Sequence, residues 1–176
     1  MIGTQTMGVT EEHLREPAGQ RELTLRFLAQ PGDINFGGKV HGGAVMKWID
    51  QAAYACAVGW SRQYCVTVCV GGIRFYKPIV IGHLVEVEAR IIHTGRTSMH
   101  VAVDVSSGDP KEAEFAHSTR CIVIFVAVDA EGNLLEVKPW IPLTDEDKAL
   151  EQYAIKLMAL RREIEQQMNS DRIGTG

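Results

Sequence analysis

The chain lacks any long apolar run: nowhere do about eighteen apolar residues follow one another, as a membrane-spanning helix requires. Its N-terminal residues contain neither the apolar core of a secretion signal nor a basic amphipathic pattern. We therefore expect a cytoplasmic protein that does not insert into a membrane.

An excess of basic residues is also missing, since 18 Lys and Arg stand against 22 Asp and Glu, for a formal net charge of −4. Nucleic acid is consequently not an expected partner. The remaining composition, 45% hydrophobic and 23% charged, is ordinary for a globular domain. At 176 residues, without internal repeats or low-complexity segments, the sequence predicts one domain with a substantial core.

Patterned cysteine and histidine are absent as well. The four cysteines form no CxxC pair, and the six histidines form no HxxxH or HExxH pair. We interpret the cysteines as reduced packing residues and predict neither a disulfide framework nor a metal site.

One long helix is predicted over residues 44–60, where the side chains are mostly apolar and no proline intervenes. Lys47, Asp50, Gln51 and Tyr54 follow one another at helical spacing, so they share one stripe of this helix. The surrounding apolar residues predict that Asp50 is buried. Because an unpaired buried carboxylate costs several kcal/mol, Asp50 either forms a structural hydrogen bond or serves chemistry.

Five stretches have the alternation or β-branched content of strands, and turn residues separate them. They cover residues 23–28, 65–76, 83–93, 97–106 and 115–129. The order β-α-β-β-β-β predicts an α+β fold in which a curved antiparallel five-stranded sheet wraps around one central helix. Short connections predict that sequential strands pair, and the first strand is expected at an edge. One helix covers only one sheet face, and open edges need cover, so we expect at least a homodimer.

A second, amphipathic helix is predicted after Thr144, which is a candidate N-cap followed by acidic residues. Its apolar side should pack against the sheet or a neighbouring subunit. We divide the chain into a polar leader (1–21), the main domain (22–142), the C-terminal helix (143–168) and a frayed tail (169–176).

The loop before the first helix carries the motifs that identify a family. They are PGDIN at 31–35 and VHGG at 40–43, followed by Asp50, IRFYKP at 73–78 and GRTSM at 95–99. In this order and spacing they resemble the hot-dog fold acyl-CoA thioesterases, particularly the branch that includes brain acyl-CoA hydrolase and its bacterial relatives. The resemblance covers about residues 23–142 and implies an acyl-CoA substrate, no cofactor, and a homodimer often assembled into a trimer of dimers.

The resemblance implies catalytic roles for Asn35, Gly42 and Asp50. Asp50 would be the general base that activates water, or alternatively a nucleophile. Asn35 would orient the water, although an asparagine in a glycine-rich loop commonly forms only an Asx turn. Gly42, at the expected helix start, would donate its backbone N–H to the thioester oxygen, with help from the helix dipole.

Substrate-binding candidates lie at two places. Gly43 would leave room for the acyl group, and His41 would line the pocket or hold Asn35. Arg96, Thr97 and Ser98, in a predicted hairpin, could hold a phosphate of coenzyme A, while a plain solvated turn is the alternative. Residues that could close the acyl pocket are Trp48, Tyr54 and Phe75.

Helix geometry adds a prediction about the assembly. Asp50 lies eight residues after Gly42, which is about 12 Å along a helix. A base and an oxyanion donor that serve one carbonyl must each approach within about 3 Å. We therefore predict that Asn35 and Gly42 of one protomer combine with Asp50 of the other. The alternatives are a non-enzymatic acyl-CoA sensor and, less favoured, a hot-dog dehydratase, which would need a histidine paired with an acid in another motif.

Overall fold

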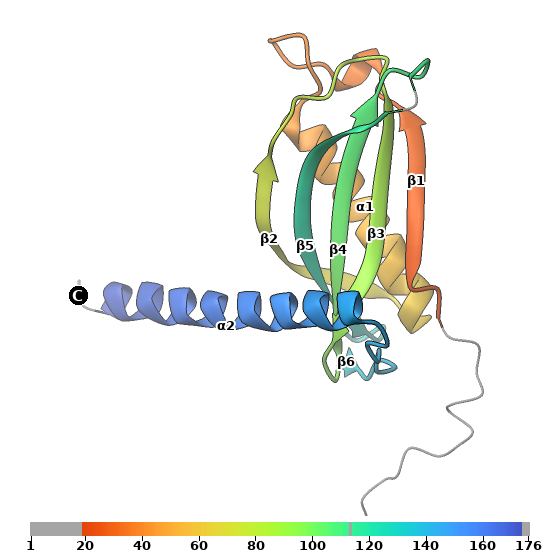
Figure 1. The fold of residues 1–176 in the computed structure, drawn as a ribbon. Helices are drawn as coiled ribbons and strands as arrows, with labels where there is room; N and C mark the ends of the chain where they lie inside the picture. Colours follow the sequence, from red (N-terminus) through yellow and green to blue (C-terminus); the bar gives the residue numbers. More distant parts are fainter. Residues whose placement is uncertain (1–18, 113, 174–176) are drawn as a thin grey trace, which may run out of the picture.

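The computed structural model describes residues 19–112 and 114–173 (Figure 1). Eighteen residues of the predicted N-terminal leader therefore lie outside the described part. The elements, in chain order, are β1 (Glu22–Leu28), the short 3-10 helix η2 (Pro31–Asp33), α1 (Gly42–Ser61), β2 (Cys65–Phe75), β3 (Leu84–Thr94), β4 (Ser98–Gly108), β5 (Ala116–Val128), β6 (Leu134–Leu135) and α2 (Asp145–Ile173). The predicted α+β class is confirmed.

The strands form one antiparallel sheet in the order β1-β3-β4-β5-β2, with the short β6 added beside β5. β1 lies at an edge, as predicted. The expectation that sequential strands pair is wrong for β2 and β3, because β2 crosses to the far edge and pairs with β5. Burial explains the order: β3, β4 and β5 are mostly buried and occupy the centre, whereas β2 is largely exposed.

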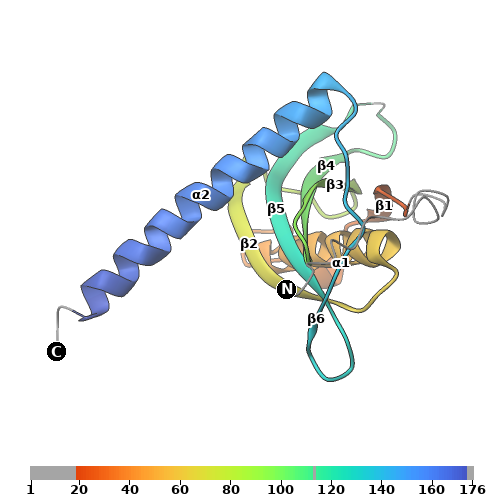
Figure 2. The same cartoon turned by 90° about the horizontal axis from the view of Figure 1, so that it is seen from below.

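Helix α1 lies in the concave face of the curved sheet (Figures 1 and 2). Small residues line its sheet-facing side, where Ala52, Ala53, Cys56 and Ala57 are completely buried. Short side chains let the helix axis approach the strands closely, and valines of β3 and β4 fill the remaining space. This packing fixes how α1 is oriented, and therefore where its remaining side chains lie.

The sheet of the same chain leaves the polar stripe of α1 uncovered. Lys47, Asp50, Gln51 and Tyr54 do share one face, as predicted, but all four are exposed in the single chain. The prediction that Asp50 is buried is therefore wrong within one protomer. The cause is that one chain supplies one sheet, which covers only one side of the helix.

Helix α2 crosses the convex face of the sheet (Figure 2). Thr144 caps it through a hydrogen bond from the Asp147 backbone N–H to Oγ1 (3.0 Å), and Ala154 is buried against the sheet. The helix continues to Ile173, five residues beyond the predicted end of the C-terminal helix at residue 168. Within the described ranges, no helix is long and apolar enough to cross a membrane.

Candidate active site

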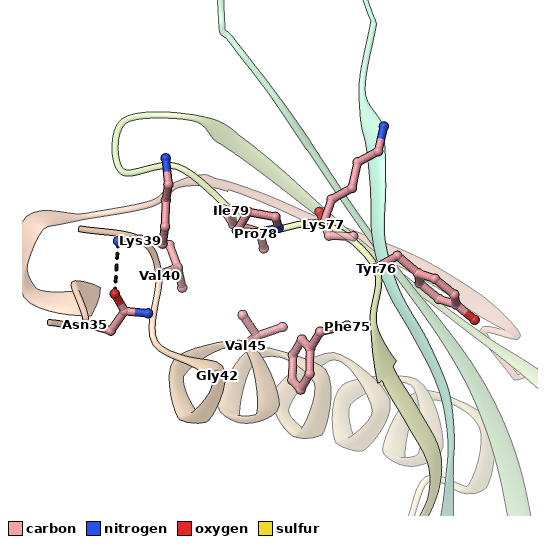
Figure 3. Close-up of a pocket in the computed structure, with 11 residues that line it drawn as sticks. Asn35, Lys39, Val40, Gly42, Val45, Phe75, Tyr76, Lys77, Pro78 and Ile79 are labelled. Carbon is pink, nitrogen blue, oxygen red and sulfur yellow. Dashed lines mark hydrogen bonds between the residues drawn. The ribbon is translucent and has the colours of Figure 1, made fainter. Parts of the chain in front are cut away.

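Asn35 organises the loop that leads into α1. Its Oδ1 accepts hydrogen bonds from the backbone N–H groups of Gly37 (2.9 Å) and Lys39 (3.1 Å). The first of these is the Asx turn that the sequence left as an alternative role. Because Oδ1 already has two donors, the side-chain amide Nδ2 is the group left for a ligand. Nδ2 has no acceptor among the described residues, and it points towards the space between Val40 and Gly42 (Figure 3).

His41 is the N-cap of α1. Its ring Nδ1 accepts a hydrogen bond from the Gly43 backbone N–H (2.9 Å), and its own backbone N–H is bonded to the Asp33 carbonyl (2.7 Å). The capping bond requires Nδ1 to be an acceptor. Both His41 and Gly43 therefore hold the helix start in place, and neither lines the cavity described below.

Gly42 is the first residue of α1, and its backbone N–H has no acceptor among the described residues. This group belongs to the positive end of the helix dipole, where a developing negative charge is stabilised. A Cβ added at Gly42 would lie 3.7 Å from the Phe75 ring, which is an ordinary contact. The glycine therefore widens the space beside its own N–H without being sterically obligatory.

Asn35 and Gly42, which carry these two unpaired donors, line one cavity of about 340 Å³ (Figure 3). Its walls come from the Asn35 loop, the start of α1, the end of β2 and the segment that follows β2. The lining residues are Asn35, Lys39, Val40, Gly42, Val45, Phe75, Tyr76, Lys77, Pro78, Ile79 and Ser118. The side chains of Lys39 and Lys77 extend from the rim, so the apolar interior is bordered by positive charge.

Asp50 lies outside this cavity, on the exposed face of α1. Its Oδ1 accepts a hydrogen bond of 2.8 Å from the Thr67 hydroxyl on β2. Sequence reasoning missed Thr67. The available signal was its position as the lone hydroxyl in the apolar run CVTVCV at 65–70. The pair orients one carboxylate towards a side of the molecule that the described residues leave uncovered.

Arg96 and Thr97 lie in the loop between β3 and β4, and Ser98 is the first residue of β4. This hairpin lies at the other end of the molecule from the cavity. The Val137 N–H bonds to the Arg96 carbonyl, and the nearby Lys138 carbonyl accepts a bond from the Trp60 indole near the end of α1. The Arg96 guanidinium forms an exposed ion pair with Glu136 (3.2 Å). One chain therefore does not bring this hairpin to Asn35 and Gly42.

Of the three residues predicted to close the acyl pocket, one lines the cavity and two lie elsewhere. Phe75 lines the cavity, whereas Trp48 is buried in the core with its ring against Phe27. Tyr54 is partly exposed on the same face of α1 as Asp50. Of these three residues, Phe75 alone lines the cavity of its own chain.

The cysteines are free, as predicted, and three of the four are buried. Burial raises the pKa of Cys56 and of Cys121 to about 12, so both thiols stay protonated near neutral pH. Burial also raises the pKa of the Cys65 thiol. These residues pack the core. Across the described part of the chain, no cluster of three or more His, Cys, Asp or Glu residues is arranged to hold a metal.

Comparisons with a family model, with related proteins and with solved structures agree on one family. The model of the Thioesterase superfamily matches residues 37–114. Protein VdlD of Helicobacter pylori is 30% identical over 146 residues, which cover 83% of each chain. The acyl-CoA thioester hydrolase YciA of Salmonella typhimurium is 33% identical over 118 residues, covering 65% of this chain and 88% of YciA. The crystal structure of an apo hexameric acyl-CoA thioesterase superposes with a TM-score of 0.78 at 30% identity, covering 82% of this chain and 92% of that chain.

Proposed function

The chain belongs to the Thioesterase superfamily and is an acyl-CoA thioester hydrolase of the hot-dog fold, and from this premise we propose how its residues cleave the substrate. The products are a free carboxylic acid and coenzyme A. The observation that supports the proposal best is the convergence of two unpaired donors, Asn35 Nδ2 and the Gly42 N–H, on one cavity.

In the proposed reaction, Asp50 removes a proton from a water molecule, and the water oxygen attacks the thioester carbonyl carbon. The Gly42 N–H binds the oxygen of that carbonyl as negative charge develops on it. Asn35 donates from Nδ2 to the water and holds it between Asp50 and the carbonyl. When the tetrahedral intermediate collapses, the C–S bond breaks and Asp50 returns its proton to the departing coenzyme A thiolate.

Thr67 has a supporting part in this scheme. Its hydroxyl donates to one carboxylate oxygen of Asp50 and leaves the other oxygen for water. In this scheme Asp50 takes the proton from water and returns it to the thiolate, so the Thr67 hydroxyl only holds the direction of the carboxylate. Thr67 is therefore a positioning residue.

Two protomers are needed to complete the proposed site, because Asp50 lies about 12 Å along α1 from Gly42. Strand β2 offers the edge for this association, since among the described strands it pairs only with β5. An antiparallel pair of β2 strands centred on Gly71 would set Thr67 opposite the partner's Phe75. Asp50 with Thr67 would then face the partner's cavity, and the reciprocal contact would build a second identical site.

Coenzyme A carries phosphates, and the cavity rim supplies Lys39 and Lys77 as candidate partners. Arg96, Thr97 and Ser98 remain proposed phosphate contacts. Because their hairpin is remote from the cavity of the same chain, they would serve a site of another copy. The exposed Arg96–Glu136 pair is worth little energy, so a phosphate can replace Glu136.

The alternatives make different predictions. A dehydratase would need a histidine beside the substrate, and no histidine is among the residues that line this cavity. A non-enzymatic sensor would bind acyl-CoA in the same cavity without turnover.

Release of free coenzyme A from short, medium, long and aromatic acyl-CoAs separates these functions. Wild type should hydrolyse at least one class, and Asp50→Asn should lose about 100-fold or more in kcat, as expected for an acid-base group. Tight acyl-CoA binding without turnover by wild type would favour the sensor and contradict the role proposed for Asp50.

A further inference from the structure

Helix α2 has an apolar stripe that is longer than the sheet beneath it. The stripe follows helical spacing on one side of α2, with Arg161 as its polar interruption. Its apolar members are Leu150, Ala154, Leu157, Leu160, Ile164 and Met168.

The first half of the stripe is covered by the chain's own sheet. Ala154 is 1% exposed and packs with Ile92 of β3, Ala102 of β4 and Ile122 of β5. Leu157 reaches β2, where its Cδ2 lies 3.8 Å from the position that a Cβ of Gly71 would take. The eight residues of α2 from Leu150 to Leu157 thus bring the helix to the edge strand.

The second half of the stripe has no such cover. Leu160, Ile164 and Met168 are 47%, 56% and 59% exposed. Leu160 and Ile164 line a largely apolar groove of about 470 Å³ with residues 69–72 of β2, so they face the level of the sheet. Both views show α2 continuing past β2, beyond which the described part of the chain has no further strand (Figures 1 and 2).

The open edge of β2 indicates what lies beneath this overhang. A strand added to β2 continues the sheet at a spacing of about 4.8 Å, and helix residues advance about 1.5 Å each. Ile164 therefore extends about 10 Å past Leu157, which is enough to reach over the second added strand. The exposed apolar residues thus lie next to an open strand edge. A second copy of the same chain can pair with the edge and cover the apolar residues.

We propose that the part of α2 beyond Leu157 is an arm that packs on the convex sheet face of a second copy joined along β2. Twofold symmetry makes the contact reciprocal, so the two α2 helices run antiparallel across the joined sheets and clasp the dimer. The proposal rests on the β2-edge dimer of the proposed function, and it assigns the helix to holding together the protomers that share a site.

The test is Ile164→Asp, with Ile155→Asp as a matched control. Ile155 is also an exposed isoleucine of α2, at 41%, but it lies nine residues earlier and so on the opposite side of the helix. Sedimentation over a protein concentration series should show a dimer dissociation constant raised by at least about 100-fold in Ile164→Asp, since each dimer buries two copies. Ile155→Asp should associate as wild type does.

A chain ended after Ala159 removes only the overhanging arm and should weaken association in the same way. Thermal unfolding of the dilute variants, followed by circular dichroism, establishes that each remains folded. Three results would each overturn the proposal. Ile164→Asp could associate as tightly as wild type, wild type could stay monomeric, or the variant could lose a larger assembly while its dimers remain intact. Acyl-CoA hydrolysis is measured separately, so a failure of the proposed function would leave the sedimentation result interpretable.

Discussion

Replacing Gly42 by proline removes the proposed oxyanion donor without removing the helix. Gly42 is the first residue of α1, a position where proline is favoured because its missing N–H has no intrahelical partner. The preceding residue, His41, has φ −69° and ψ 136°, the extended conformation that a residue before proline requires. The fold should therefore accept the substitution.

The expected cost can be estimated from the unpaired state of this N–H. Loss of one oxyanion donor typically lowers kcat by about 10²–10³, or ~3 kcal/mol. Gly42→Ala is the control, because it keeps the N–H while adding a Cβ at an ordinary 3.7 Å from Phe75. The Cβ is common to both variants, whereas only the proline ring removes the N–H and fills its place, so a kcat of Gly42→Pro close to that of Gly42→Ala would exclude the donor role.

The assay is steady-state coenzyme A release by both variants at matched protein concentration, with thermal unfolding to confirm that each is folded. If Gly42→Pro turned over within about threefold of Gly42→Ala, the expected 10²–10³ loss would be absent and the oxyanion role of this N–H would be refuted.

The remaining predictions concern Thr67 and His100. Thr67→Val should lower kcat by about tenfold or more, because a hydrogen bond to a charged group is worth ~1.5–3 kcal/mol. Thr67→Ser keeps the hydroxyl and should stay near wild type. Equal rates in all three proteins would contradict the positioning role. Burial, then the neighbouring charges of His93 and Arg161, lowers the pKa of His100 from 6.5 to about 4. The unfolded chain therefore binds more protons than the folded chain between these values, so the free energy of unfolding should fall by about 3 kcal/mol as pH drops through that window. Denaturant titrations at pH 7 and 4 should show a smaller drop for His100→Leu, and an unchanged drop would exclude His100 as the cause.

Local patterns in the sequence predicted the elements well. The apolar run around Asp50 defined α1, and alternation located the long strands to within a few residues of their ends. The β2 register breaks between Gly71 and Arg74, where Gly72 follows Gly71 inside the strand. These features depend on residues close in sequence, where helical and strand periods act directly.

Features that depend on distant contacts were harder to predict. Nothing near Pro78 in the sequence reveals that β2 crosses to the far edge of the sheet, because that position depends on the burial of β3 and β4. Asp50 was expected to be buried, yet the side of α1 that carries it is not covered by its own sheet. The separation of Arg96 from Asn35 has a similar origin. Two motifs that identify the same family can lie at opposite ends of the folded molecule, and the spacing in the sequence does not show this.

Subunit mixing tests the shared site most directly. Asn35→Ala and Asp50→Ala proteins, each inactive alone, are combined under conditions in which protomers exchange, and coenzyme A release is followed. If Asn35 and Gly42 act with the partner's Asp50, mixed dimers contain one intact site, and random exchange restores about one quarter of wild-type activity. If all the residues of a site came from one chain, the mixture would stay inactive despite proven exchange, and that result would contradict the account.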